Sequence, residues 1–159
     1  MLAFQINIIG LPQLQNSLGD FANRVQDLSP AFETIHQDFL RIEQEQFAGK
    51  GVGPTGPWPA LSKEYAAWKV AHGFGTDILV LTGALKRSLT EDGGDHIKEI
   101  KPQEAKFGTR NLFPSGWSSG AVHQVARGKG RPARPPIDIS ERNTEDWKRM
   151  IEDYIYGGK

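Results

Sequence analysis

Apolar residues recur every three or four positions in two stretches of the N-terminal half, which is the spacing of helices with one buried face. The first stretch opens at Pro12, which suits the first turn of a helix, and the second opens at Ser29 and Pro30, where the serine can act as cap. The first apolar stripe is Leu14, Leu18, Phe21, Val25 and Leu28. The second is Phe32, Ile35, Phe39, Leu40 and Phe47. The pattern predicts a helical hairpin, or one long helix interrupted near Pro30.

Short runs elsewhere alternate apolar and polar residues or lie beside turn signals, as strands with one buried face do. The predicted strands are residues 4–8, 88–91, 96–101, 105–109 and 137–139. The sequence Asp92-Gly93-Gly94-Asp95 is a turn signal, so we expect the second and third of these strands to pair as a hairpin. Start signals add two helices: Ser62 can cap residues 63–72, and Thr144 can cap a last helix that Gly157 ends.

Glycine and proline concentrate in a loop, residues 49–59, which cannot be regular structure, and in an arm, residues 127–136. The prolines of the arm favour an extended or polyproline conformation. We therefore expect one α+β domain spanning 1–159. In it a small antiparallel sheet packs with the N-terminal helical hairpin and a C-terminal helix, and carries long Pro/Gly-rich loops. We also expect the loop and the arm to reach neighbouring chains, which would complete their burial.

Charge and composition exclude several classes of function. The chain has 19 basic and 19 acidic side chains, which argues against a dedicated nucleic-acid binder because such binding depends on neutralising phosphates. It has no cysteine, so disulfides and thiol catalysis are excluded. No apolar run reaches about 18 residues and the first residues lack the pattern of a signal peptide, so we expect no membrane partner.

No motif predicts a cofactor, a metal or an active site. The run Gly51-x-Gly53-x-x-Gly56 matches a dinucleotide-binding loop in letters only, because it leads into Pro57-Trp58-Pro59 rather than into a helix. The four histidines stand 24 or more positions apart, without the helical spacing of a zinc pair. We expect no carboxylate–histidine cluster and no enzyme, with a cell-wall hydrolase as the enzymatic alternative.

Large aromatic and basic residues are the candidates for interfaces. Trp68 and Trp147 fit the core faces of helices, whereas Trp58 and Trp117 lie in loops, where they anchor a partner or pack on their own core. If Trp58 is an anchor, Trp58→Ala should cost assembly more than monomer stability. The arm also carries a basic run, which is a solvated loop or a segment that docks on an acidic neighbouring subunit or lies against DNA. Its residues are Arg127, Lys129, Arg131 and Arg134.

A series of residues in order resembles the phage virion morphogenesis family over about residues 30–156. The series is Phe39 and Phe47 ahead of the glycine-rich loop, Trp58-Pro59-Ala60-Leu61-Ser62, Lys69, Ile78-Leu79, Thr82-Gly83-x-Leu85-x-x-Ser88, His123-Gln124 and Pro132-Ala133-Arg134-Pro135. Two positions depart from the family pattern: Pro136 stands where an aromatic usually follows Arg-Pro, and Ser119-Gly120 where a tyrosine precedes His-Gln.

Members of that family are tail completion or minor tail proteins of tailed bacteriophages. The resemblance implies a structural virion protein of the tail or neck, made in the host cytoplasm, that completes the tail or joins it to the head as a homo-oligomeric ring. A hexamer would match the tail, and the ring would contact neighbouring neck or tail proteins, with His123 and Gln124 among the interface residues. The alternative is a DNA-contacting factor at the end of the packaged genome, whose affinity would fall steeply with salt.

Overall fold

The computed structural model describes residues 10–111 and 132–157. The helices are α1 (Leu11–Gln26), α2 (Ser29–Ala48), α3 (Lys63–Ala71), α4 (Ala84–Thr90) and α6 (Glu141–Tyr156), and the strands are β1 (His96–Lys101) and β2 (Glu104–Thr109). The expected α+β class with a small antiparallel sheet is confirmed. The strand expected at residues 4–8 lies outside the described residues.

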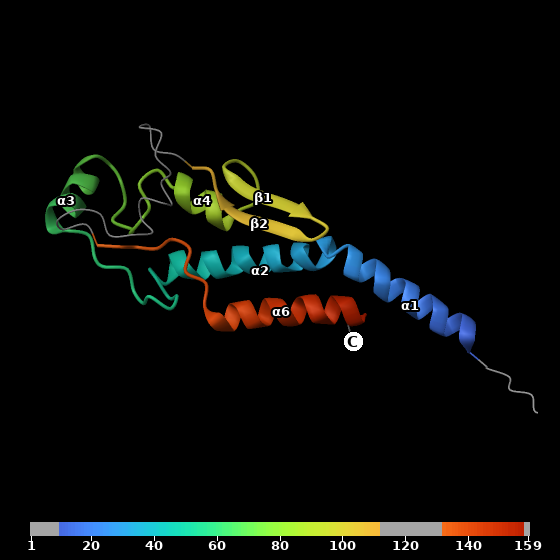
Figure 1. The fold of residues 1–159 in the computed structure, drawn as a ribbon. Coiled ribbons are helices and arrows are strands. Elements are labelled where there is room, and N and C mark those ends of the chain that lie inside the picture. The colour runs from blue at the N-terminus through green and yellow to red at the C-terminus, as the bar shows by residue number, and fades with distance from the viewer. Residues whose placement is uncertain (1–9, 112–131, 158–159) are drawn as a thin grey trace, which may run out of the picture.

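Helix α2 is the centre of the fold (Figure 1). Helix α6 runs beside it on one side, and α4 and the β1–β2 hairpin cover the other side. Between these layers lies the core, which consists of Phe39, Leu40, Phe47, Trp58, Leu85 and Leu89. Burying each such side chain contributes roughly 1.5–3 kcal/mol, so these few residues supply much of the drive to fold.

Helix α1 does not fold back on α2. Of the two alternatives predicted for this region, the long helix interrupted near Pro30 is therefore confirmed, and the helical hairpin is wrong. In Figure 1, α1 projects past the end of α2 and away from the rest of the molecule. The break follows from Pro30, which has no amide hydrogen to continue a helix, and from Asp27, whose carboxylate accepts a hydrogen bond from the backbone N–H of Ser29 at 3.0 Å. Leu28 at the break donates its N–H to Pro102 O, 2.8 Å away on the hairpin turn.

The helix caps follow the sequence in one case and differ in another. Ser62 caps α3 as predicted, since its Oγ accepts the N–H of Tyr65 at 3.2 Å. The last helix starts earlier than Thr144, because Ser140 and Asn143 form a reciprocal cap in which each side chain binds the backbone N–H of the other. Gly157 ends this helix in the left-handed conformation, as expected.

The predicted hairpin is displaced along the chain. Strand β1 pairs with β2, and the turn lies at residues 102–103 rather than at 92–95. Residues 88–90 complete α4 because Leu85 and Leu89, four positions apart, both point into the core, which is a helical period rather than the period of a strand. Residues 137–139 form no strand, although Ile137 and Ile139 pack against the core.

The loop 49–59 is held by its own chain. The side-chain oxygen of Gln46, on α2, accepts the N–H groups of Val52 at 2.8 Å and Gly53 at 2.9 Å. Gly51 has φ +94°, and a Cβ on it would lie 2.6 Å from Trp58 N, so the loop requires glycine there. These contacts fold the loop over the end of α2, and its contact with neighbouring chains stays a prediction.

The described part of the arm, residues 132–136, lies on this loop. Arg134 donates to the carbonyls of Pro59 at 2.7 Å and Ala60 at 2.8 Å. Pro135 O accepts the indole N–H of Trp58 at 2.9 Å. Two segments without regular structure therefore satisfy some of each other's backbone groups, and contacts of these residues with neighbouring chains stay a prediction.

Trp58 belongs to the core and is not an exposed anchor. It is 5% exposed, and its ring meets that of Phe47 edge-on with 5.3 Å between centroids. The loop position of Trp58 suggested an interface, but a tryptophan can cap its own core when the loop folds inward. Trp68 shows the opposite error: it was expected in the core and is 42% exposed.

We therefore expect Trp58→Ala to lower the free energy of unfolding by about 3–5 kcal/mol, a loss comparable with that of Leu85→Ala at about 2–5 kcal/mol. Trp68→Ala is the matched control and should cost about 1 kcal/mol or less, because that side chain is already partly in water. Urea unfolding of the three variants measures this. Equal losses for the two tryptophan variants would contradict the assignment of Trp58 to the core.

Glu43 is a buried acid on α2. It is 0% exposed, and neither carboxylate oxygen has a hydrogen-bond partner among the described residues. Burial, together with repulsion from Asp138, raises the pKa of Glu43 to about 8. The side chain is therefore mainly protonated at neutral pH in the folded chain, whereas in the unfolded chain it ionises near pH 4.5.

This difference makes stability depend on pH in a fixed direction. The folded state holds the Glu43 proton between about pH 4.5 and pH 8, so the free energy of unfolding should fall as pH rises through that window. The loss from pH 5 to pH 9 should reach about 4 kcal/mol. Glu43→Gln should remove this part of the loss, and Glu45→Gln, exposed on the same helix, should retain it. Identical pH profiles for both variants in thermal melts would show that Glu43 is ionised in the fold.

Candidate functional site

The most prominent surface feature is the apolar face of α1. Its residues are Leu11, Leu14, Leu18, Phe21 and Val25. The sequence predicted this stripe, but it is not buried: Leu14 is 56% exposed and Leu18 is 59% exposed. A contiguous exposed apolar stripe on a helix is typical of an interaction surface rather than of scattered surface hydrophobics.

The C-terminal half of α1 is attached to α6 and to the hairpin turn. The ring of Phe21 lies 5.9 Å from that of Tyr156 on α6, and Arg24 donates to Ile155 O at 2.8 Å. Gln103, on the hairpin turn, donates to the carbonyls of Val25 and Gln26 at 2.8 Å each. The N-terminal half carries Leu14 and Leu18, the two most exposed residues of the apolar face.

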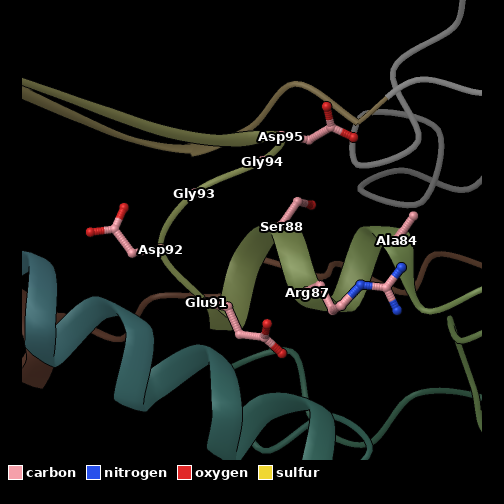
Figure 2. A pocket seen from close by; sticks show the side chains of 8 residues that line it. All are labelled: Ala84, Arg87, Ser88, Glu91, Asp92, Gly93, Gly94 and Asp95. Carbon is pink, nitrogen blue, oxygen red and sulfur yellow. The ribbon is translucent and has the colours of Figure 1, made fainter.

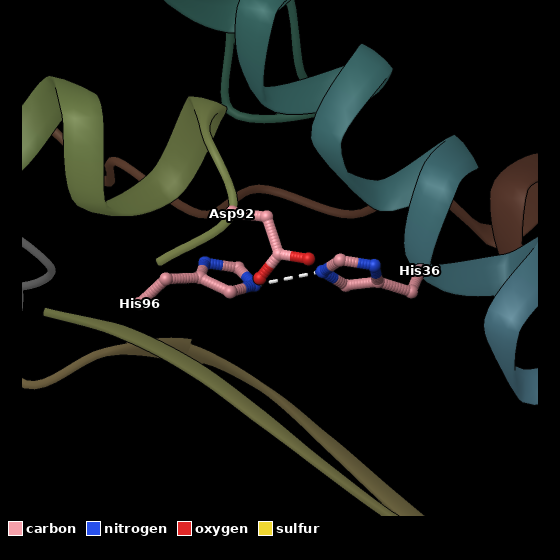
Figure 3. A group of neighbouring side chains, drawn as sticks. All are labelled: His36, Asp92 and His96. Atoms are coloured by element: carbon pink, nitrogen blue, oxygen red, sulfur yellow. Dashed lines mark hydrogen bonds between the residues drawn. The ribbon is translucent and has the colours of Figure 1, made fainter. Parts of the chain in front are cut away.

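A second candidate site is a buried pair of histidines, His36 on α2 and His96 on β1 (Figure 3). Their Nε2 atoms lie 2.8 Å apart, although the residues are 60 positions apart in sequence. His36 is 0% exposed and His96 is 5% exposed, and the rings of Phe39 and Phe107 pack around them. Burial is the main reason why the pKa of His36 lies below its usual range, with the nearby Lys98 ammonium adding to the effect.

Hydrogen bonds determine which nitrogen of each ring carries the proton. Nδ1 of His96 lies 2.9 Å from Ser88 O, which can only accept, so this nitrogen is protonated and Nε2 presents a lone pair. His36 Nε2 donates to that lone pair, while its Nδ1 is 3.4 Å from the side-chain nitrogen of Gln37. The two rings thus form one donor–acceptor pair when both are neutral, and each has a second polar neighbour.

Asp92 completes this group. One ligand atom from each of His36, Asp92 and His96 lies within 4.8 Å of the others, and Asp92 is the exposed member. Figure 3 shows its carboxylate beside the facing ring nitrogens. The ammonium of Lys98 lies 3.5 Å from Asp92 and 2.8 Å from Glu33, so it bridges the two carboxylates.

An open recess borders the group through Ser88 and Asp92 (Figure 2). It measures about 390 Å³ and is lined by Ala84, Arg87, Ser88, Glu91, Asp92, Gly93, Gly94 and Asp95. Three of these side chains are acidic and one is basic, so the recess favours small cations over anions. It lacks the apolar lining that is typical of sites for organic ligands.

Two of the expected interface residues lie within the described residues, and the others lie outside them. The two are Trp58 and Arg134, which contact each other's segments, not a free surface. The remaining candidates, which lie outside the described residues, are Trp117, His123, Gln124, Arg127, Lys129 and Arg131. The expectation that no carboxylate–histidine cluster exists is wrong. Spacing along the sequence reveals pairs within one helix, whereas this group joins α2 to the hairpin. No periodic signal marks such a pair.

Comparison with models of known protein families, with curated proteins and with solved structures gave no match. Among the described residues, no helix is both long and apolar enough to cross a membrane.

Proposed function

We propose that the chain is a structural subunit that acts by assembly, as a tail-completion or neck component of a tailed bacteriophage that forms a homo-oligomeric ring. The observation that carries the assembly role is the uncovered apolar face of α1, defined above by Leu11, Leu14, Leu18, Phe21 and Val25. The tail or neck assignment follows from the family resemblance of the sequence. No enzymatic step is part of this proposal.

The physical state of α1 supports a need for a partner. A helix of 16 residues is marginally stable in water on its own, and Gly19 within it costs roughly 1 kcal/mol relative to alanine. Leu14 and Leu18, in its first half, are the most exposed residues of its apolar face. Covering Leu14 and Leu18 by another protein surface would stabilise both the helix and the complex.

We infer that the partner is a second copy of this chain. Helix α1 carries one acidic and one basic residue, Asp20 and Arg24, among uncharged amides. Copies of such a helix do not repel each other, whereas a strongly charged partner would find nothing complementary. In a ring, α1 of one subunit would extend over the next.

The residues behind the family resemblance are mainly those that build the fold. Phe39, Phe47, Trp58 and Leu85 are in the core. Lys69 is 2% exposed, and its ammonium donates to the carbonyls of Asp77 and Val80, which it holds at 2.8 and 2.7 Å. A resemblance carried by core and loop-bracing residues favours a shared fold over a chance match of surface letters.

The alternative, a DNA-contacting factor, gains no support from the described residues. Arg134, one of the four basic residues of the arm, already donates to two carbonyls of its own loop. A binding titration at two salt concentrations still separates the hypotheses, because phosphate contacts weaken steeply with salt.

A phage in which the coding sequence is deleted should produce filled heads and tails that fail to join, or tails of incomplete length. A missing ring leaves the neighbouring components without their binding surface. Electron microscopy of lysates, with the wild-type sequence supplied in trans as the control, measures this. Normal virions from the deletion phage would rule out the proposed function.

The double variant Leu14→Gln/Leu18→Gln should raise the protein concentration needed for oligomer formation by at least tenfold. Its melting temperature should stay within a few degrees of wild type, since both side chains are already exposed. The matched control is Asn16→Gln/Asn23→Gln, on the opposite side of the same helix, which should assemble normally. Light scattering over a concentration series, or incorporation into particles, gives the readout. Equal assembly of both double variants would exclude α1 as the contact.

A further inference from the structure

We propose that His36, His96 and Asp92 form a binding site for a divalent transition-metal ion, with Zn²⁺ the best match. The observation is the convergence of two buried imidazole nitrogens and one carboxylate oxygen within 4.8 Å. This inference does not depend on the proposed function, because it concerns the joint between α2 and the hairpin and not the α1 face.

The donor set selects the class of ion. Two neutral imidazoles and one carboxylate are the ligands that Zn²⁺ and its neighbours in the first transition row prefer. Mg²⁺ and Ca²⁺ prefer all-oxygen shells and are poor matches for two histidines. Three protein ligands leave one position of a tetrahedral ion to water.

The distances need little adjustment to hold an ion. Two nitrogens bound to one tetrahedral zinc at about 2.0–2.1 Å lie roughly 3.3 Å apart. The Nε2 atoms of His36 and His96 are 2.8 Å apart, so they must separate by only about 0.5 Å. Asp92 is exposed, and rotation of its side chain can bring an oxygen into place without moving the backbone.

The hydrogen bonds around the pair leave His96 ready to bind a metal ion, whereas His36 must first change its tautomer. His96 already donates its Nδ1–H to Ser88 O, the type of outer contact that orients metal-binding histidines and leaves Nε2 free to bind. His36 must move its proton from Nε2 to Nδ1. Gln37, which is exposed and lies beside Nδ1, can turn its amide so that its oxygen accepts that proton's hydrogen bond. The ion then replaces the His36–His96 hydrogen bond, and no net proton is released.

Lys98 is the competitor for the site. Its ammonium is 3.5 Å from Asp92, and a metal ion would displace it from that carboxylate. Glu33, 2.8 Å from the same ammonium, remains to pair with it. The acidic recess beside Asp92 provides the side from which an ion can arrive. Binding would join α2, β1 and the segment between α4 and β1 at one point.

The test is calorimetric titration of the tag-free full chain with ZnCl₂, paired with thermal melts. We expect one ion bound per chain and, at a hundredfold excess over the dissociation constant, a melting temperature raised by roughly 5–10 °C. MgCl₂ at the same concentration should do neither. Co²⁺ bound in place of zinc should give the intense visible absorption of a four-coordinate ion.

Variants locate the site. Asp92→Asn should weaken zinc binding by about tenfold or more, and His96→Gln by about a hundredfold or more. Glu91→Gln removes an equal charge from the same recess, and His72→Gln removes an exposed histidine, and both should bind as wild type does. Lys98→Gln, which removes the competing cation, should strengthen binding by roughly threefold or more.

Two results would overturn the proposal. One is the lack of saturable 1:1 zinc binding by the folded wild-type chain. The other is binding that Asp92→Asn leaves unchanged, which would place the ion elsewhere on the chain. Because Asp92 is exposed and outside the core, its variant should fold even if replacement of a buried histidine prevents folding.

Discussion

The structure depends on the burial of α2 and on partners for the polar groups that are buried with it. Besides its apolar residues, this helix buries His36, Glu43 and Gln46. An uncompensated polar group in an interior costs several kcal/mol, so each of these side chains imposes a requirement on whatever covers it. The requirements are met differently: by a second histidine, by retention of a proton, and by the backbone of a loop.

The hydrogen bonds of Gln46 explain where the irregular parts of the described chain lie. Gln46 holds the loop 49–59, and the loop in turn receives Arg134 and the indole contact to Pro135. The loop 49–59 and residues 132–136 are therefore held against the body of the chain. Their lack of regular hydrogen bonding is compensated by side chains from α2 and from each other, which is how a chain of this length can carry long loops and still close its core.

Helix α1 stands apart from this core: none of its described residues is buried. The hairpin turn and α6 contact its C-terminal half. Its row of exposed apolar side chains is the basis of the proposed assembly role. The proposed metal site lies between α2 and β1, away from the apolar face of α1. A bound ion would stiffen the contact between α2 and the hairpin without changing the α1 face.

Local signals in the sequence determined the elements that have a clear hydrophobic period or a clear start or stop residue. The stripes of α1 and α2, the Ser62 cap, strand β2 and the end of α6 at Gly157 all follow from short-range rules about spacing and backbone conformation. The failures are equally local. Residues 88–91 looked like a strand because a turn signal followed them, whereas the core contacts of Leu85 and Leu89 kept them helical.

Tertiary structure alone decided which faces are covered and which distant residues meet. Nothing in the spacing of His36 and His96 indicates that they touch, because their contact depends on how the hairpin packs on α2. The periodicity of α1 predicts an apolar face but not whether that face is buried, since burial depends on the path of the chain after Pro30. Likewise, a loop tryptophan such as Trp58 is an anchor or a core residue according to where its loop folds, and that is a long-range property.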